Sequence, residues 1–92
     1  MEKEKKYYLT CEILPGMFSN ERGVEFKDIN GNYVSGFWPE KFFKEKENKL
    51  EISLREIKGD KALIFGQMTS AVGYGFFQGL GFYVDKNLIS SE

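Results

Sequence analysis

The chain has no histidine and only one cysteine among its 92 residues. Without histidine it lacks the commonest general base, the commonest metal ligand and the middle member of a Ser-His-Asp triad. A single cysteine forms no intrachain disulfide and supplies too few thiolates for structural zinc. The sequence therefore predicts a protein that is not an enzyme, that holds no metal or small-molecule cofactor, and that resides in the reducing cytoplasm.

An excess of charge of one sign is also missing. Thirteen Lys and Arg residues balance 14 Asp and Glu residues, for a formal net charge of −1. Such a chain has no long-range field to steer it toward nucleic acid or an anionic bilayer. The charged start, residues 1–6, leads into no apolar segment of signal-peptide type, so we expect no export signal.

Aromatic side chains, in contrast, are abundant. They make up 16% of the chain, with nine Phe and five Tyr. This favours a packed, β-rich domain over disorder, because aromatic residues supply buried area and suit pleated surfaces. The length fits one domain. We expect a single domain over residues 1–92, with short disordered ends at about 1–5 and 90–92.

Strict alternation of apolar and polar residues predicts a first strand over residues 7–14. Its expected inner side consists of Tyr7, Leu9, Cys11 and Ile13. A cysteine on that side behaves as a small buried hydrophobe, and no histidine exists to activate it as a nucleophile. After the turn at Pro15-Gly16, we expect Met17 and Phe18 to fold back over the core.

The most distinct local signal is a hairpin. Residues 23–29 and 33–38 alternate as strands on either side of Asn30-Gly31. This dipeptide tolerates the positive φ that a tight hairpin turn requires. We therefore predict that the two segments pair with each other.

The segment 39–57 has two interpretations. Pro39 can open a helix, and residues 42–47 have high helix propensity. Residues 50–55, however, alternate as a strand, and residues 58–61 form a turn signal before the apolar strand 62–68. We favour a hairpin, and we keep as the alternative an α+β domain with a helix within 39–57.

One short stretch of sequence recurs. Residues 36–41 (Gly-Phe-Trp-Pro-Glu-Lys) and 81–86 (Gly-Phe-Tyr-Val-Asp-Lys) are chemically similar at every position. An apolar pair follows each copy, offset by one residue. Either the likeness is chance or the chain consists of two pseudo-symmetric three-strand units. We predict an all-β fold, a small bent antiparallel barrel of five to six short strands, which removes exposed edges.

The first copy also resembles a known family. Residues 36–43 carry a glycine, two apolar residues and a proline, then a polar pair and two apolar residues. This pattern resembles the strand-to-short-helix signature of Src-homology-3 barrels. Lys41 and Phe42 stand where that family has Asn and Tyr. The resemblance implies a small, strongly bent barrel, and no proline-rich-peptide site is carried over from it.

The longest uncharged run extends from Ala62 to Val84. It is long enough to cross a membrane as a helix, but its five glycines and two glutamines lower the gain on transfer into lipid. We therefore expect no membrane span. Instead we predict a strand over 62–68, a glycine-rich loop over 69–80 and a last strand over 81–85. The glycines of this loop lack the spacing of a dinucleotide or phosphate loop.

The loop 69–80 is the candidate contact surface. Its proposed binding residues are Tyr74, Phe76, Phe77 and Gln78. Exposed aromatic residues there would form an apolar patch that calls for a protein partner or a second copy of this chain. We therefore expect a non-enzymatic interaction module. The alternative is a barrel that stacks single-stranded nucleic acid on the same rings, although no cation lies near them in the sequence.

Overall fold

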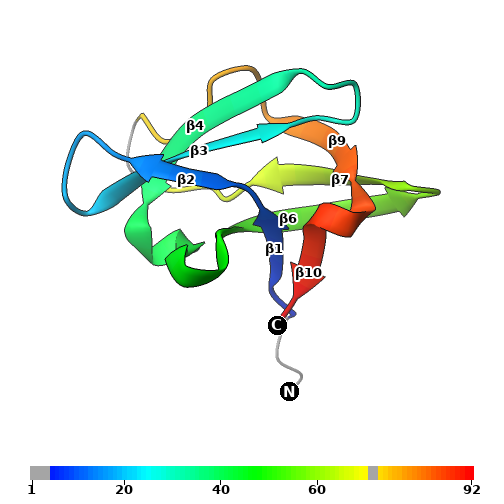
Figure 1. Cartoon of the computed structure of the whole chain (residues 1–92), viewed down its shortest axis with the longest axis horizontal. Coiled ribbons are helices and arrows are strands. Elements are labelled where there is room, and N and C mark those ends of the chain that lie inside the picture. Colours follow the sequence, from blue (N-terminus) through cyan, green and yellow to red (C-terminus); the bar gives the residue numbers. More distant parts are fainter. Residues whose placement is uncertain (1–4, 71–72) are drawn as a thin grey trace.

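The structure, a computed structural model, describes residues 5–70 and 73–92. Two antiparallel sheets form the molecule (Figure 1). One has the order β10-β1-β6-β7-β9, with β5 paired to β6 off this path, and the other has the order β2-β3-β4-β8. The strands are β1 (Tyr7–Thr10), β2 (Glu12–Pro15), β3 (Glu21–Lys27), β4 (Tyr33–Pro39), β5 (Phe43–Lys44), β6 (Lys49–Lys58), β7 (Lys61–Gly66), β8 (Gly75–Phe76), β9 (Gly81–Asp85) and β10 (Ile89–Ser91). The all-β, antiparallel class is confirmed.

The segment 39–57 contains no α-helix, so the α+β alternative is wrong. It forms single 3-10 turns at η1 (Glu40–Phe42) and η2 (Glu45–Glu47), the short strand β5, and most of β6. Phe43 pairs with Leu50 in the β5–β6 hairpin. Leu50 and Ile52 are both buried. Burial of apolar residues at every second position therefore outweighs the helix propensity of the charged stretch before them.

The predicted β3–β4 hairpin is confirmed around its Asn30-Gly31 turn. Gly31 has φ +83°, a conformation that glycine adopts without steric cost. The Asp28 carboxylate accepts hydrogen bonds from the backbone N–H groups of Asn30 and Asn32, both at 2.9 Å. A side chain within the turn therefore fixes the register of the two strands.

The predicted first strand is divided at Cys11. Its first half, β1, belongs to one sheet and its second half, β2, to the other. Leu9 and Cys11 are buried as predicted, while Tyr7 and Ile13 are half-buried. Tyr8 on the other side of β1 is buried as well, and the Lys44 ammonium lies 4.3 Å from the centre of its ring.

The pairing of strands repeats between the two halves of the chain. Leu9 lies opposite both Leu50 and Ile89, and Leu50 lies opposite both Leu9 and Phe43. Each half has a first strand (β1 in one, β6 in the other), an antiparallel strand pair, a 3-10 turn and a short strand that pairs with the first strand of the other half. This pattern agrees with the pseudo-twofold relation that the sequence echo suggests.

The structural repeat also corrects the alignment of the echo by one residue. The turns η1 and η3 (Lys86–Leu88) follow Pro39 and Asp85 directly, whereas the sequence match pairs Pro39 with Val84. In the corrected alignment Trp38 and Val84 are equivalent, and both are buried. The apolar pairs 42–43 and 88–89 that follow the two copies therefore align with the structure, whereas the copies themselves align with a shift of one residue.

The predicted barrel is present only in part. Within the described part of the chain, no strand ladder joins the two sheets. They are joined by the passage of β1 into β2 and by a common core of buried side chains from both sheets (Figure 1). The largest fully buried side chains are those of Trp38, Leu9, Leu50, Ile52, Ile64, Val24, Val34 and Val84.

The prediction that Met17 and Phe18 cover the core is wrong, because these side chains are 81% and 67% exposed. The buried Glu21 occupies the space beneath this turn instead. Its carboxylate accepts a hydrogen bond from the Met17 N–H at 2.8 Å. A Cβ at Gly16 would lie 2.4 Å from the Glu21 Cγ. The turn is thus held by a carboxylate, and its apolar side chains point outward.

The ends and the uncharged run are placed as follows. Ser90 and Ser91, expected in a disordered end, pair with β1, while residues 1–4 of the other expected end lie outside the described residues.

The uncharged run 62–84 supplies strands β8 and β9 and most of β7. In the residues that the structure describes, no helix is long and apolar enough to cross a membrane.

Replacing Gly36 with Ala is expected to destabilise the fold. A Cβ at this position would lie 2.1 Å from the carbonyl oxygen of Gly75, so β8 would have to move off β4. Such overpacking costs about 1–3 kcal/mol, measured as the free energy of unfolding in urea. Gly59→Asn is the control, because nothing lies within 4 Å of a Cβ there and Asn tolerates its positive φ. Equal stability of the two variants would contradict the close approach of β8.

The stability of the protein is expected to fall as the pH rises above 9, partly through Cys11. Burial raises the pKa of its thiol from 9.0 to about 12. Between these values the unfolded chain loses a proton that the folded chain retains, so the free energy of unfolding falls by about 1.4 kcal/mol per pH unit. Urea unfolding with a reductant at several alkaline pH values measures this slope. Cys11→Ala should have a smaller slope, and parallel slopes would refute this assignment.

Candidate functional site

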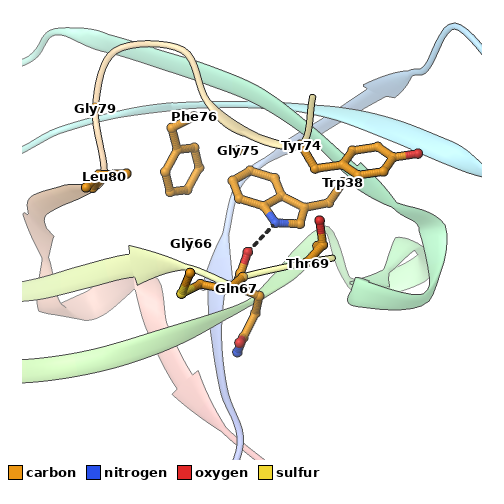
Figure 2. Close-up of a pocket in the computed structure, with 10 residues that line it drawn as sticks. Trp38, Gly66, Gln67, Thr69, Tyr74, Gly75, Phe76, Gly79 and Leu80 are labelled. Carbon is orange, nitrogen blue, oxygen red and sulfur yellow. Dashed lines mark hydrogen bonds between the residues drawn. The ribbon is translucent and has the colours of Figure 1, made fainter. Parts of the chain in front are cut away.

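A cavity of about 250 Å³ lies where the loop after β7 returns to β4. Figure 2 shows Phe76, Trp38 and Tyr74 side by side along one side of it, with Gln67 and Thr69 opposite. Met68 and Leu80 also line it and are 94% and 82% exposed. The other lining residues are the glycines 66, 75 and 79. Every lining residue is uncharged.

Trp38 forms the buried wall of the cavity. Its indole Nε1 donates a hydrogen bond to the Gln67 carbonyl oxygen at 2.9 Å, and its side chain is 1% exposed. A Cβ at Gly66 would lie 2.4 Å from the Trp38 Cζ2. Only glycine therefore lets the end of β7 pass beside the indole. This contact fixes the start of the loop against the wall of the cavity.

Phe76 belongs both to the core and to the cavity. Its ring packs edge-to-face on Trp38 at 4.5 Å between centroids, and on Phe26 and Phe82 at 5.4 and 5.6 Å. The backbone of Phe76 pairs with Gly36 in β4. The residue thus anchors the loop to both sheets, and only part of its ring faces the cavity.

Two glycines keep the side of the cavity next to Phe76 open. Gly75 and Gly79 have φ +142° and +154°, values that side-chain-bearing residues rarely adopt. Among the described residues, no atom lies within 4 Å of a Cβ at Gly75. The backbone conformation therefore favours glycine at both positions, and no described side chain packs against Gly75.

Tyr74 is positioned by its hydroxyl group. Loss of contact with water is the main cause that raises the pKa of Tyr74, and a hydrogen bond to the Glu21 carboxylate raises it further. Glu21 is 6% exposed and is the residue that also holds Met17. A second carboxylate touches the opposite wall, where the Gln67 Nε2 donates to a Glu51 oxygen at 3.3 Å. Two anions therefore lie directly behind uncharged lining residues.

The other two predicted site residues lie away from the cavity. Phe77 is 64% exposed and packs on Phe37 at 5.6 Å, on the outer face of the four-stranded sheet. The Gln78 Oε1 accepts the Ser35 N–H at 3.0 Å, and its Nε2 donates to the Ser35 hydroxyl at 3.4 Å. Gln78 therefore holds the loop against the edge of β4.

Of the four predicted residues, the structure brings Tyr74 and Phe76 together and separates Phe77 and Gln78 from them. The sequence interpretation missed the two exposed rim residues, Met68 and Leu80. Both are large apolar residues in a glycine-rich uncharged segment, a signal that was available. The predicted strand 62–68 includes Met68, whereas β7 ends at Gly66, so Met68 belongs to the loop.

The described residues contain no group of three His, Cys, Asp or Glu side chains that could hold a metal ion. No protein-family model matches the sequence, and comparisons with curated proteins and with solved structures give no significant match. The contacts around the cavity are therefore the basis for a functional proposal.

Loss of the Gln78 side chain is expected to loosen the loop locally. Gln78→Ala removes the acceptor of the Ser35 N–H and leaves one edge of β4 without its side-chain partner. A hydrogen bond of this kind contributes about 0.5–1.5 kcal/mol. Native-state hydrogen exchange of the Ser35 and Phe77 amides should accelerate accordingly. Gln78→Glu keeps an acceptor oxygen and is the control; unchanged exchange in Gln78→Ala would show that the contact is dispensable.

Proposed function

We propose that this chain is a non-enzymatic, cytoplasmic interaction module, a small barrel-like pair of sheets that binds a protein partner through the loop between β7 and β9. The cavity in this loop receives one side chain of the partner. The observation that carries this proposal is the exposure of Met68 and Leu80, 94% and 82%, at the rim of an uncharged aromatic cavity. Large apolar residues that surround a preformed cavity are typical of protein contact sites.

The length of the loop supports this proposal. The first half of the chain closes its hairpin with residues 28–32, whereas the second half uses residues 67–80 for the equivalent connection. Long connections in compact domains are usually functional where they lack secondary structure of their own. The short turn already reaches the other half, since the Ile29 N–H donates to the Tyr83 carbonyl oxygen at 2.8 Å. In the described part of the longer connection only β8 pairs with β4, and the exposed Met68 and Leu80 lie outside this pairing.

The size and charge of the cavity favour a protein side chain over other ligands. Its volume of about 250 Å³ lies below the about 300–1,000 Å³ typical of cofactor and drug sites. Nucleic acid, in contrast, is bound chiefly by Lys and Arg at its phosphates, and neither occurs among the described residues that line the cavity. A protein partner is thus the favoured ligand, and a second copy of this chain is the simplest alternative occupant.

The rim is tested by replacing Met68 and Leu80 together with Ser. The immobilised wild-type protein should enrich a defined set of peptides from a random displayed library, and the double variant should bind those peptides at least about tenfold more weakly. Both side chains are exposed, so the fold should survive, which circular dichroism checks. Sedimentation of the protein alone at increasing concentration tests self-association.

Phe77→Ser is the matched control, because Phe77 is also apolar and exposed but packs on Phe37, away from the cavity. It should bind the selected peptides like the wild type. Peptides that depend on Phe77 and not on Met68 and Leu80 would move the contact surface to that outer face. If the wild type enriched no peptide and stayed monomeric, the proposal would be wrong.

A further inference from the structure

We propose, on the basis of the function proposed above, that the side chain received by the cavity is cationic, that of a Lys or Arg of the partner protein. The described residues that line the cavity include three aromatic side chains and no Lys or Arg, and two carboxylates contact its lining residues from outside the cavity. Charge complementarity therefore selects the occupant.

The first step concerns the rings. The face of an aromatic ring attracts cations, most strongly where water is excluded. This chain makes that contact repeatedly with its own cations. Within the described residues they lie 4.3–5.4 Å from ring centres, in the pairs Lys27–Tyr33, Lys41–Phe42, Lys44–Tyr8, Arg55–Phe65 and Lys61–Tyr83. None of these rings lines the cavity. Among the rings that line the cavity, Trp38 is buried, and no cation of the described chain lies over the half-buried rings of Tyr74 and Phe76 in these pairs.

The second step concerns the carboxylates. The Tyr74 hydroxyl is hydrogen-bonded to Glu21, and the Gln67 side chain is hydrogen-bonded to Glu51. Arg22, the neighbour of Glu21 in the sequence, is paired with Glu40 at 3.1 Å and Glu45 at 2.8 Å. Lys6 reaches Glu51 only at 4.0 Å. These two carboxylates attract a cation in the cavity and leave a neutral group of equal size unaffected.

The third step concerns shape. Lys and Arg side chains carry a long apolar stem and a charged head, and the stem packs readily on apolar surface. Met68 and Leu80, which line the cavity and are largely exposed, suit the stem, while the half-buried rings of Tyr74 and Phe76 suit the head. Beside them, no atom of the described residues lies within 4 Å of a Cβ at Gly75, which leaves room for a second chain to approach.

The test uses two probes of the same shape and different charge. Choline carries a quaternary ammonium, and 3,3-dimethylbutan-1-ol is its neutral isostere. Trp38 is the only tryptophan and lines the cavity, so its fluorescence reports occupancy directly. We expect choline to change the Trp38 emission in a saturable way and to bind roughly tenfold more tightly than the neutral isostere. Equal or tighter binding of the isostere, or no binding of either probe, would overturn the inference.

Variants of Glu21 and Glu51 test whether these carboxylates cause the preference of the cavity for a cation. Glu21→Gln and Glu51→Gln should each weaken choline binding several-fold without changing the binding of the isostere. Glu56→Gln is the matched control, because Glu56 accepts a hydrogen bond from Tyr83 at 2.9 Å, outside the cavity. If Glu21→Gln fails to fold, Glu51→Gln, which sits on a partly exposed strand position, still decides the question. Equal weakening by Glu56→Gln would show that only the net charge matters, which would count against the cavity.

The peptides selected in the experiment on Met68 and Leu80 separate this inference from the proposed function. Peptides that require the rim and share a Lys or Arg whose replacement by Met abolishes binding support both. Peptides that require the rim but carry an apolar anchor leave the proposed function standing and refute the cationic occupant.

Discussion

The contact between Trp38 and Gly66 is the constraint on which the rest of this structure depends. The indole belongs to the four-stranded sheet and the glycine to the end of a strand in the other sheet, and a Cβ at Gly66 would overlap the ring. Because the indole also binds the Gln67 carbonyl oxygen, the chain leaves β7 in a fixed direction. One contact thus joins the sheets and forms the wall of the cavity.

The two halves of the chain share a strand plan and differ where function is proposed. Leu9 and Leu50 pair at the centre, and each also pairs with the short last strand of the opposite half. These central residues are fully buried. The added loop of the second half lies outside this centre. A loop can vary there without disturbing the core, which is the usual relation between a rigid scaffold and a binding segment.

Sequence patterns predicted much of the fold and about half of the site. The β3–β4 hairpin and β9 follow from turn chemistry and alternation, which act over a few residues. The failed expectations involved distant partners. Met17 and Phe18 lie outside because Glu21 fills the space beneath them. Phe77 and Gln78 lie outside the cavity because they contact β4. Gln78 is hydrogen-bonded to Ser35 at the edge of this strand, and Phe77 packs on Phe37 on its outer face.

The sequence by itself determined the all-β class, the main turns and the absence of histidine chemistry, because composition and alternation act locally. It also marked the uncharged segment that contains the cavity. Only the tertiary structure decided which apolar residues of that segment are core and which are rim, and it alone placed Glu21 and Glu51 behind the cavity. The physical reason is that burial and electrostatic field are sums over side chains from several strands, and their proximity follows from packing rather than from spacing in the sequence.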